Sequence, residues 1–374
     1  MLAGRSWRSF DWLLIIVTVL ICTIGVISIY SATFSVETGD KLASRLFFRQ
    51  TTFIISGMVL CFLAAAVDYQ LLGEAHRLLY ALTLGLLGFV ELRGQLGFGA
   101  QSWLGSNAGI QPSELSKILL IVFLARFMSE HIEEETSSRW ILLSGVLLVP
   151  PVLLIYIQPD LGTALVVVAI WIGMAFAAGI RWTYVLALGV AGAAAVPAVW
   201  LSMRGYMRDR VMTFVNSILR PSGPEAILDY NTRQALTSIG SGGLFGKGFL
   251  NGTQSQLYFL RVRHTDYVFS VFSEEFGFLG ATVLLLLLTV LLWRILSVAS
   301  HARDSFGQLV ACGVATMIFV QAFVNIAVNL GMLPVTGLTL PLVSYGGSSV
   351  WATLLGIGLV ESVSLRHRPL EFAD

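Results

Sequence analysis

Long apolar stretches recur from one end of the chain to the other, and they limit its fold more than any other feature. A helix needs about 20 mostly apolar residues to cross the hydrocarbon core of a bilayer. The 374 residues offer ten such segments, at 12–31, 50–67, 76–92, 114–128, 139–157, 161–179, 182–201, 267–296, 306–331 and 347–364. The sequence therefore predicts an all-α, polytopic integral membrane protein with ten transmembrane helices, in which residues 1–374 form a single membrane domain.

The composition agrees with a membrane protein and argues against other classes. Only 12% of the residues are charged, about half of the roughly 25% that is usual in soluble domains. The 23 basic and 22 acidic residues nearly cancel, whereas general nucleic-acid binding needs a strongly basic face. The three cysteines lie in apolar runs without a C-x-x-C spacing, so they predict neither a disulfide framework nor a zinc site.

The distribution of Lys and Arg predicts the orientation of the helices. An even number of spans places both termini on the same side of the membrane. With cytoplasmic termini, the inner segments hold ten arginines and the short outer loops five basic residues, and an excess of positive charge is expected inside. We therefore expect cytoplasmic termini, with the longest hydrophilic segment, 202–265, as an extracytoplasmic loop between the seventh and eighth spans.

In this orientation five helices begin at the outer face, and polar residues gather at their starts. These starts are Arg49-Gln50, Gln111-Pro112-Ser113-Glu114 with Lys117, Gln158-Pro159-Asp160, His264-Thr265-Asp266 and Tyr345 to Ser349. The inner helix starts show no comparable set, and the inner halves of the helices are nearly bare of polar residues. Because helix N-termini carry free N–H groups and a partial positive charge, several of them pointing at one region predict an anion site.

These polar residues also allow a purely structural interpretation. Glu114 and Lys117 share a helix face, so they form either an intrahelical ion pair or the wall of a polar cavity. Asp160 could simply complement the dipole of its helix. Asp266 either caps the following helix or takes part in catalysis. The spacing alone leaves these alternatives open.

The long loop contains two further patterns. Apolar residues at helical spacing over 211–219 follow Arg204, Arg208 and Arg210, which predicts a basic amphipathic helix on the outer leaflet or packed on neighbouring spans. Six glycines then fall between 240 and 252. They do not have the spacing of a phosphate-binding P-loop, and we expect them to permit tight turns and a close approach of the backbone to a ligand.

Several motifs, spread in order over most of the chain, carry a resemblance to a known family. They are Gly99-Ala-Gln-Ser-Trp103, Gln111-Pro-Ser-Glu-Leu115 with Lys117, Gln158-Pro-Asp-Leu-Gly-Thr163, Ile239 to Gly248, Gly252-Thr-Gln254, His264-Thr-Asp266, Glu274-Glu275 and Leu333 to Ser349. The chain resembles the SEDS family (shape, elongation, division and sporulation). Pro334 to Gly337 and Gly252 to Gln254 lean toward the RodA type, which serves elongation, rather than the division type (FtsW-like).

The resemblance implies a peptidoglycan glycosyltransferase. Such enzymes polymerise lipid II at the outer leaflet of the bacterial cytoplasmic membrane and release undecaprenyl diphosphate. They work with a class B penicillin-binding protein, a transpeptidase that cross-links the new strand. Lipid II and membrane lipids are therefore the expected partners besides that protein, and no nucleic acid is expected.

The resemblance also implies roles for individual residues. Asp266 is expected to be the catalytic residue, either as a general base or as a ligand of a divalent cation, Mg²⁺ or Mn²⁺. The departing diphosphate needs positive charge nearby. The residues expected to bind substrate are Arg49, Glu114, Lys117, Asp160, Lys247, His264 and Ser344.

Two positions depart from the pattern of the family. Many members carry Pro-Glu shortly before the His-Thr-Asp motif, where this chain reads Leu260-Arg261-Val262-Arg263, and many carry Arg where it has Ser102. We expect the reaction to be unchanged and the local grip on the sugar diphosphate to differ, with Arg261 or Arg263 compensating.

Two other classes of function are alternatives. A lipid II flippase or transporter should have polar residues along a path through the membrane, whereas here they gather on one side. A scaffold that only positions a penicillin-binding protein would tolerate alanine at Lys117 and Asp266.

Overall fold

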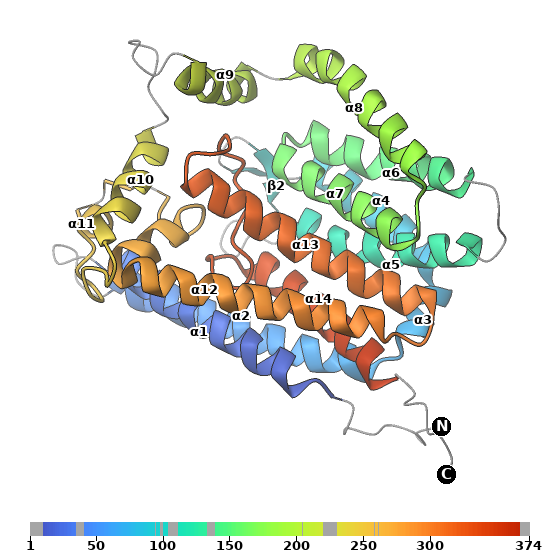
Figure 1. Ribbon diagram of the computed structural model, residues 1–374, viewed down its shortest axis with the longest axis horizontal. Coiled ribbons are helices and arrows are strands. Elements are labelled where there is room, and N and C mark those ends of the chain that lie inside the picture. The colour runs from blue at the N-terminus through green and yellow to red at the C-terminus, as the bar shows by residue number, and fades with distance from the viewer. Residues whose placement is uncertain are drawn as a thin grey trace.

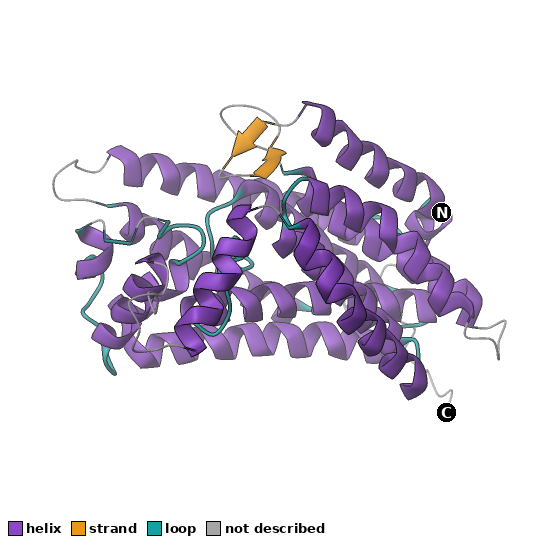
Figure 2. Ribbon diagram, turned by 90° about the horizontal axis from the view of Figure 1, so that it is seen from above, coloured by secondary structure: helices purple, strands orange, loops and turns teal. Residues whose placement is uncertain are grey.

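The computed structural model describes residues 10–34, 41–93, 95–97, 100–103, 111–132, 139–203, 205–219, 230–257, 259–260 and 262–366. Within these residues the chain is helical except for connecting turns and one short hairpin, the antiparallel strands β1 (Gln95–Gly97) and β2 (Ala100–Trp103) (Figure 2). The helices are α1 (Trp12–Thr33), α2 (Lys41–Ala66), α3 (Tyr69–Glu74), α4 (His76–Arg93), α5 (Pro112–Ile132), α6 (Arg139–Ile157), α7 (Leu161–Ala177), α8 (Trp182–Ser202), α9 (Gly205–Leu219), α10 (Tyr230–Gly242), α11 (Thr253–Gln256), α12 (Val268–Ser300), α13 (Ser305–Asn329) and α14 (Gly347–Leu365).

A helix occupies each of the ten predicted spans, namely α1, α2, α4, α5, α6, α7, α8, α12, α13 and α14. In the described part of the chain, seven helices are long and apolar enough to cross a membrane by length and composition, and α7 is apolar but shorter. The charged residues Glu114, Lys117, Arg126 and Glu130 make α5 more polar than these. The predicted all-α, polytopic membrane class is confirmed.

The centre of the bundle is α13, which packs against α5, α7, α12 and α14 (Figure 1). Its apolar side chains, such as Val310, Val314 and Ile318, are buried, and so are the amides Asn325 and Asn329 near its end. A helix that is surrounded by other helices must satisfy its polar side chains inside the protein. The polar residues of α13 therefore point to fixed internal partners.

The two ends of the bundle differ in what they hold. At one end, called the terminal end here, α1 begins and α14 finishes, because the backbone N–H of Asp11 donates to Glu361 Oε2 over 3.1 Å. At the other, the cavity end, α5, α7, α12 and α14 begin and α13 finishes. The first and last helices thus start and stop at the same end, as an even number of crossings requires.

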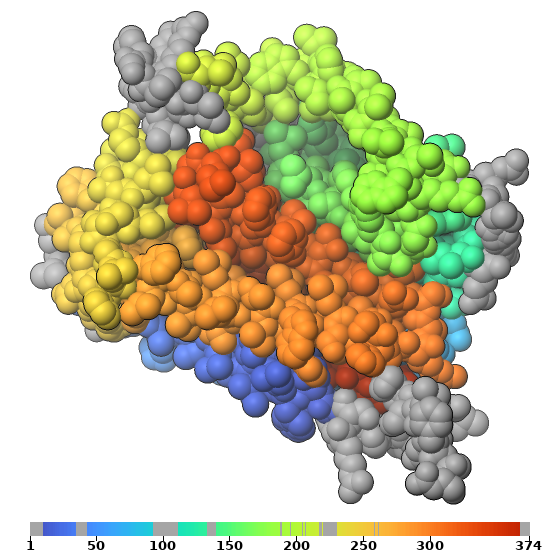
Figure 3. All heavy atoms as spheres, viewed as in Figure 1, coloured from blue at the N-terminus to red at the C-terminus, as the bar shows by residue number. Residues whose placement is uncertain are grey.

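Helix α8 is the exception to this close packing. None of its described side chains is buried, and the surface is hollowed beneath it (Figure 3). Tyr156 of α6 meets Ser202 at its end over 2.7 Å. Arg208 of α9 donates to the carbonyls of Trp200 and Leu201, at 2.9 and 2.6 Å, so α8 and α9 are joined by the last turn of α8.

Candidate active site

A cavity of about 530 Å³, lined by both polar and apolar groups, lies at the cavity end, beneath α9. Its wall combines the starts of α5, α7 and α14, the turn before α12, the loop after α13 and one face of α9. Four carboxylates and one guanidinium line it: Glu114, Asp160, Asp209, Asp266 and Arg210. The predicted gathering of helix starts is therefore present, and it encloses a cavity large enough for part of a small ligand.

The start of α5 supplies Glu114 and Lys117. Lys117 Nζ lies 2.7 Å from Glu114 Oε1, and the two side chains are 0% and 7% exposed. Glu114 reaches the cavity wall, whereas Lys117 lies below it. Both interpretations of this pair hold at once, because the ion pair exists and its acidic member faces the cavity.

The start of α7 supplies Asp160, which occupies the N-cap position. Its carboxylate accepts hydrogen bonds from the backbone N–H and the hydroxyl of Thr163, at 3.0 and 2.8 Å, and from Gln111 Nε2 at 3.0 Å. Burial raises the pKa of Asp160, and the bonds from Thr163 oppose that rise. Asp160 is thus a helix cap, and its bond to Gln111 also ties the start of α7 to the start of α5.

Asp266 lies in the turn before α12, and its side chain does not cap that helix. Tyr267 holds the N-cap position, and no side-chain capping bond is made there. Instead the backbone carbonyl of Asp266 accepts from Asn325 Nδ2 at 3.0 Å and from Asn329 Nδ2 at 2.9 Å. Asn329 Oδ1 also accepts from the backbone N–H of Ser270. The peptide of Asp266 is therefore clamped while its carboxyl faces the cavity.

The environment of Asp266 suits a general base. Burial raises the pKa of Asp266 to about 6, and a hydrogen bond from Thr265 and the charge of Arg210 act in the opposite direction. A base works best when its pKa lies near the operating pH. At pH 7 this carboxyl is mostly ionised and still a stronger base than an exposed aspartate.

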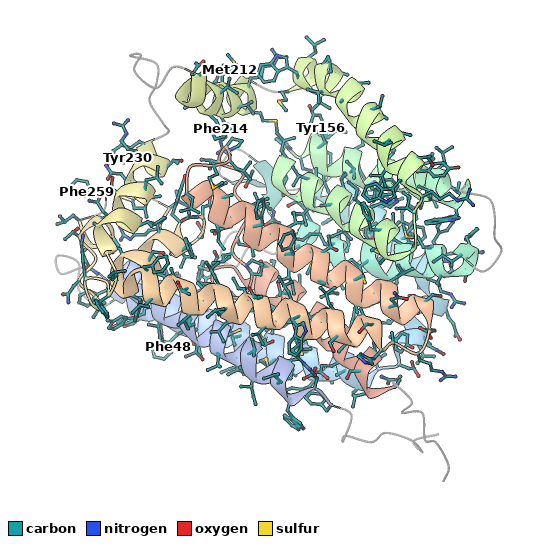
Figure 4. The ribbon with its side chains drawn as sticks, in the orientation of Figure 1. Phe48, Tyr156, Met212, Phe214, Tyr230 and Phe259 are labelled. Carbon is teal, nitrogen blue, oxygen red and sulfur yellow. The ribbon has the colours of Figure 1, made fainter. Side chains whose placement is uncertain are left out.

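Arg210 is the cation that the cavity wall presents. It belongs to α9, where the sequence predicted a basic amphipathic helix, and it donates to the carbonyl of Val335 at 3.3 Å. Figure 4 shows Phe214 on the side of α9 that faces the bundle and Met212 on the other side. Phe214 lines the cavity, so α9 forms its roof, and the exposed Met212 lies on the opposite side of the helix.

Ser344 and His264 support the wall from behind. Ser344 Oγ donates to the carbonyl of Thr265 at 2.6 Å and accepts from the backbone of Leu340 at 2.8 Å. The ring of His264 meets that of Tyr345 edge-on, with centroids 5.7 Å apart. Burial lowers the pKa of His264, which favours the neutral ring. These contacts hold the turn that carries Asp266, and a direct contact with substrate stays a prediction.

Arg49 and Lys247 are not among the residues that line the cavity. Arg49 lies over the ring of Phe53, 6.0 Å from its centroid. It is also near Tyr345, which lines the cavity: burial raises the pKa of that phenol, and the charge of Arg49 acts in the opposite direction. Lys247 is paired with Glu274 at 2.7 Å. Their predicted binding of substrate therefore has no support from the cavity itself and stays a prediction.

The two arginines that were expected to compensate for the missing Pro-Glu have different outcomes. Arg263 is buried and its Nε donates to the carbonyl of Ala32 at the end of α1, so it braces the loop against α1. Arg261 lies outside the described residues.

Sequence reasoning missed the asparagines that clamp Asp266. A signal was present, because Asn325 and Asn329 are four residues apart in an otherwise apolar span and so share one helix face. Polar side chains on a buried helix usually have a specific partner. The spacing indicated that the two amides act together, but it could not show that both bind the carbonyl of Asp266.

The expectation that the inner halves of the helices are nearly bare was wrong. At the terminal end Arg294 of α12 lies 2.5 Å from Asp11, and the backbone of Asp11 binds Glu361. Glu361 is fully buried. These residues were missed because each stands alone in its apolar segment, and only the packing of α1, α12 and α14 brings them together.

The expected divalent cation has no ready-made protein site in the part of the chain that is described. No group of three or more His, Cys, Asp or Glu side chains there could hold a metal ion. Mg²⁺ is often held by one or two carboxylates together with substrate phosphates. The cavity residues fit that mode of binding, with Asp266 as the protein ligand and a diphosphate supplying the rest.

Comparison with known sequences identifies the family. The sequence model of the FtsW/RodA/SpoVE family of cell cycle proteins matches residues 11–369. The chain belongs to this family. The match spans the whole bundle, including the residues that line the cavity, and the resemblance seen in the motifs is confirmed.

Individual relatives agree with this assignment. The chain is 39% identical to stage V sporulation protein E of Bacillus subtilis, over 96% of this chain and 98% of the relative. It is 38% identical to the peptidoglycan glycosyltransferase MrdB of Escherichia coli K12, over 85% of each chain. A solved chain from a peptidoglycan synthase complex that coordinates polymerization and crosslinking is 33% identical, with a TM-score of 0.79 over 96% of this chain and 98% of that one. These names agree with the predicted enzyme class.

Proposed function

We propose that this protein is a peptidoglycan glycosyltransferase of the elongation type, which polymerises lipid II and releases undecaprenyl diphosphate. The observation that carries the proposal is the carboxyl of Asp266, which has a clamped backbone and a pKa of about 6, at the wall of the cavity. The chain belongs to a family, and one of its relatives is named as a peptidoglycan glycosyltransferase, which supports the reaction class. The motifs Pro334 to Gly337 and Gly252 to Gln254 support elongation over division.

In the proposed reaction a sugar hydroxyl displaces the lipid diphosphate. A bond forms between the 4-hydroxyl oxygen of the acceptor and the anomeric carbon of the donor, and the bond from that carbon to the diphosphate breaks. Asp266 accepts the proton that the hydroxyl loses. The amides of Asn325 and Asn329 fix its peptide, so the backbone that carries the carboxylate needs no further ordering when substrate binds.

The leaving diphosphate needs positive charge around it. Arg210 supplies a full positive charge at the wall. Lys117 acts from below by pairing with Glu114, which keeps that carboxylate in place. In the alternative role of Asp266, its carboxylate would hold a Mg²⁺ or Mn²⁺ ion together with the diphosphate instead of accepting the proton, and the ion would neutralise part of the same charge.

The proposed location is the bacterial cytoplasmic membrane, with both termini in the cytoplasm and the cavity at the outer leaflet. The excess of arginine in the predicted inner segments supports this orientation. The start of α1 and the end of α14 lie together at the terminal end, opposite the cavity. We propose a class B penicillin-binding protein as the partner, because the similar solved chain belongs to a complex that couples polymerization with crosslinking.

A polymerisation assay tests the proposal. The purified protein, together with a class B penicillin-binding protein, is incubated with lipid II and either Mg²⁺ or Mn²⁺, and the glycan products are separated on a gel. We expect long glycan strands from the wild type and none from Asp266→Ala. Full activity of Asp266→Ala would refute the assigned base. Absence of polymer from the wild type under every metal condition would refute the proposed polymerase activity.

A flipping assay in vesicles separates the transport alternative. Reconstituted protein is given fluorescent lipid II, and its movement between leaflets is measured without polymerisation. The proposal expects no movement above that of protein-free vesicles. Flipping that survives in Asp266→Ala would favour the flippase, and polymerase activity lost only when complex formation is lost would favour the scaffold.

A further inference from the structure

Helix α12 is broken two turns after it begins. Gly277 has a φ of +68°, inside a stretch that is otherwise helical. The break divides α12 into an outer part, 268–276, and a long remainder that ends at Ser300. Because Asp266 lies two residues before the outer part, the angle at Gly277 contributes to the position of Asp266.

The glycine-rich segment 243–248, called the splint here, bridges this break. Its backbone N–H groups at Lys247 and Gly248 donate to the carbonyls of Glu274 and Glu275, at 3.0 and 2.9 Å. Its carbonyls at 243 and 244 accept from the N–H groups of 278 and 279, at 2.9 and 3.1 Å. The backbone bonds that the helix loses at the break are thus replaced by bonds to the splint.

The glycines serve this contact. A Cβ on Gly246, whose φ is +80°, would lie 2.0 Å from the carbonyl oxygen of Glu275, and a Cβ on Gly277 would lie 2.3 Å from the nitrogen of Gly246. No side chain fits at either position. The close backbone approach expected from these glycines is therefore made to α12.

Glu274 ties the rest of the loop to the outer part of α12. One oxygen of this fully buried carboxylate accepts from Lys247 Nζ at 2.7 Å, from Thr253 Oγ1 at 3.0 Å and from the backbone of Gln254 at 3.2 Å. Lys247 is the only cation that the described structure pairs with Glu274. Removing one member of a buried ion pair leaves an uncompensated charge, which is strongly unfavourable.

We propose that the Lys247–Glu274 ion pair is a positioning device, which fixes the outer part of α12 and so aims Asp266 into the cavity. The path runs from Glu274 along the helix to Ser270, whose hydroxyl donates to Asn329 at 2.6 Å, and from Asn329 to the carbonyl of Asp266. The inference rests on the proposed polymerase function. It gives Lys247 a role that differs from binding the diphosphate.

Three variants distinguish the two roles in the polymerisation assay. Lys247→Met removes the charge, Lys247→Arg keeps it, and Lys247→Met combined with Glu274→Gln removes both charges while keeping an oxygen for Thr253 and Gln254. We expect Lys247→Met to lower kcat by about 10- to 100-fold with KM for lipid II unchanged. Lys247→Arg and the double variant should recover most of kcat.

The outcomes against the proposal are equally definite. A rise in KM that the double variant does not reverse would assign Lys247 to substrate, and an unchanged kcat in Lys247→Met would also overturn the proposal. If Lys247→Met does not fold, the double variant alone is used: recovery of most of kcat supports the proposal, and a raised KM overturns it. Wild-type protein and Asp266→Asn run in parallel, so a failure of the polymerase proposal is seen as absence of polymer from the wild type.

Discussion

The two ends of the bundle contain similar charged residues in different settings. At the cavity end Glu114, Asp160 and Asp266 face an open volume. At the terminal end Asp11, Arg294 and Glu361 are packed between helices and bind one another. The charged groups themselves are of the same kind, so composition does not separate the two clusters.

The difference lies in what holds each carboxyl and what it faces. Asp266 is held through its backbone, by the amides of Asn325 and Asn329, and its side chain is left to the cavity. Both the backbone N–H and the carboxylate of Asp11 bind partners within the protein. A catalytic carboxyl needs a fixed peptide and a side chain that is available to substrate. In a structural carboxyl, protein partners occupy the side-chain oxygens.

The largest expected effect comes from replacing one carboxylate oxygen by an amide nitrogen at each end of the bundle. Asp266→Asn should lower kcat for polymerisation by about 10²- to 10⁴-fold, because the amide cannot accept the proton. Asp304→Asn, before α13, is the matched control. Its Oδ1 caps Gly307 at 2.7 Å, a bond that an amide oxygen keeps, whereas the bonds that its Oδ2 accepts from Tyr69 and Gln70 lie at the terminal end, away from the cavity. It should keep nearly full activity. Similar losses in both variants would show that the two ends are not functionally distinct.

A smaller effect is expected when each ion pair loses its cation. Lys117→Met leaves Glu114 buried and unpaired, and Arg294→Met does the same to Asp11. Each change should destabilise the protein by about 3 to 5 kcal/mol, measured as a lower melting temperature. Only Lys117→Met should also lower kcat per folded molecule, by about 100-fold. Adding Glu114→Gln to Lys117→Met should restore stability without restoring activity, and recovery of both would make the pair purely structural.

The smallest effect is on the pH dependence of kcat/KM, which should depend on Asp266 in the cavity and not on the terminal end. The pKa of Asp266 is raised from its ordinary 3.8 to about 6 by burial, so the base is protonated below that pH and ionised above it. The kcat/KM for lipid II should therefore fall about tenfold for each pH unit below about 6. Arg294→Met should leave this limb in place. A midpoint near pH 4 would mean that Asp266 is solvated during catalysis.

Much of the cavity could be predicted because its residues belong to helix starts. Asp160 precedes an apolar run, and Glu114 and Lys117 lie three residues apart, so local rules place them on known faces of known helices. Arg210 could be placed on an amphipathic helix but not in the cavity wall. That placement depends on how α9 lies against the loop after α13, for which Arg210 and Val335 give the contact.

By itself the sequence determined the membrane class, a helix at each of ten positions, and the family. Apolar runs of a length that crosses a bilayer have no other stable fold, and motifs are local strings. Only the tertiary structure decided which charged residues face a cavity and which neutralise one another. It showed that Lys247 belongs to a splint on α12 and that Asn325 and Asn329 hold Asp266. Those pairings join residues far apart in the chain or on separate helices, and helix periodicity says nothing about partners on another element.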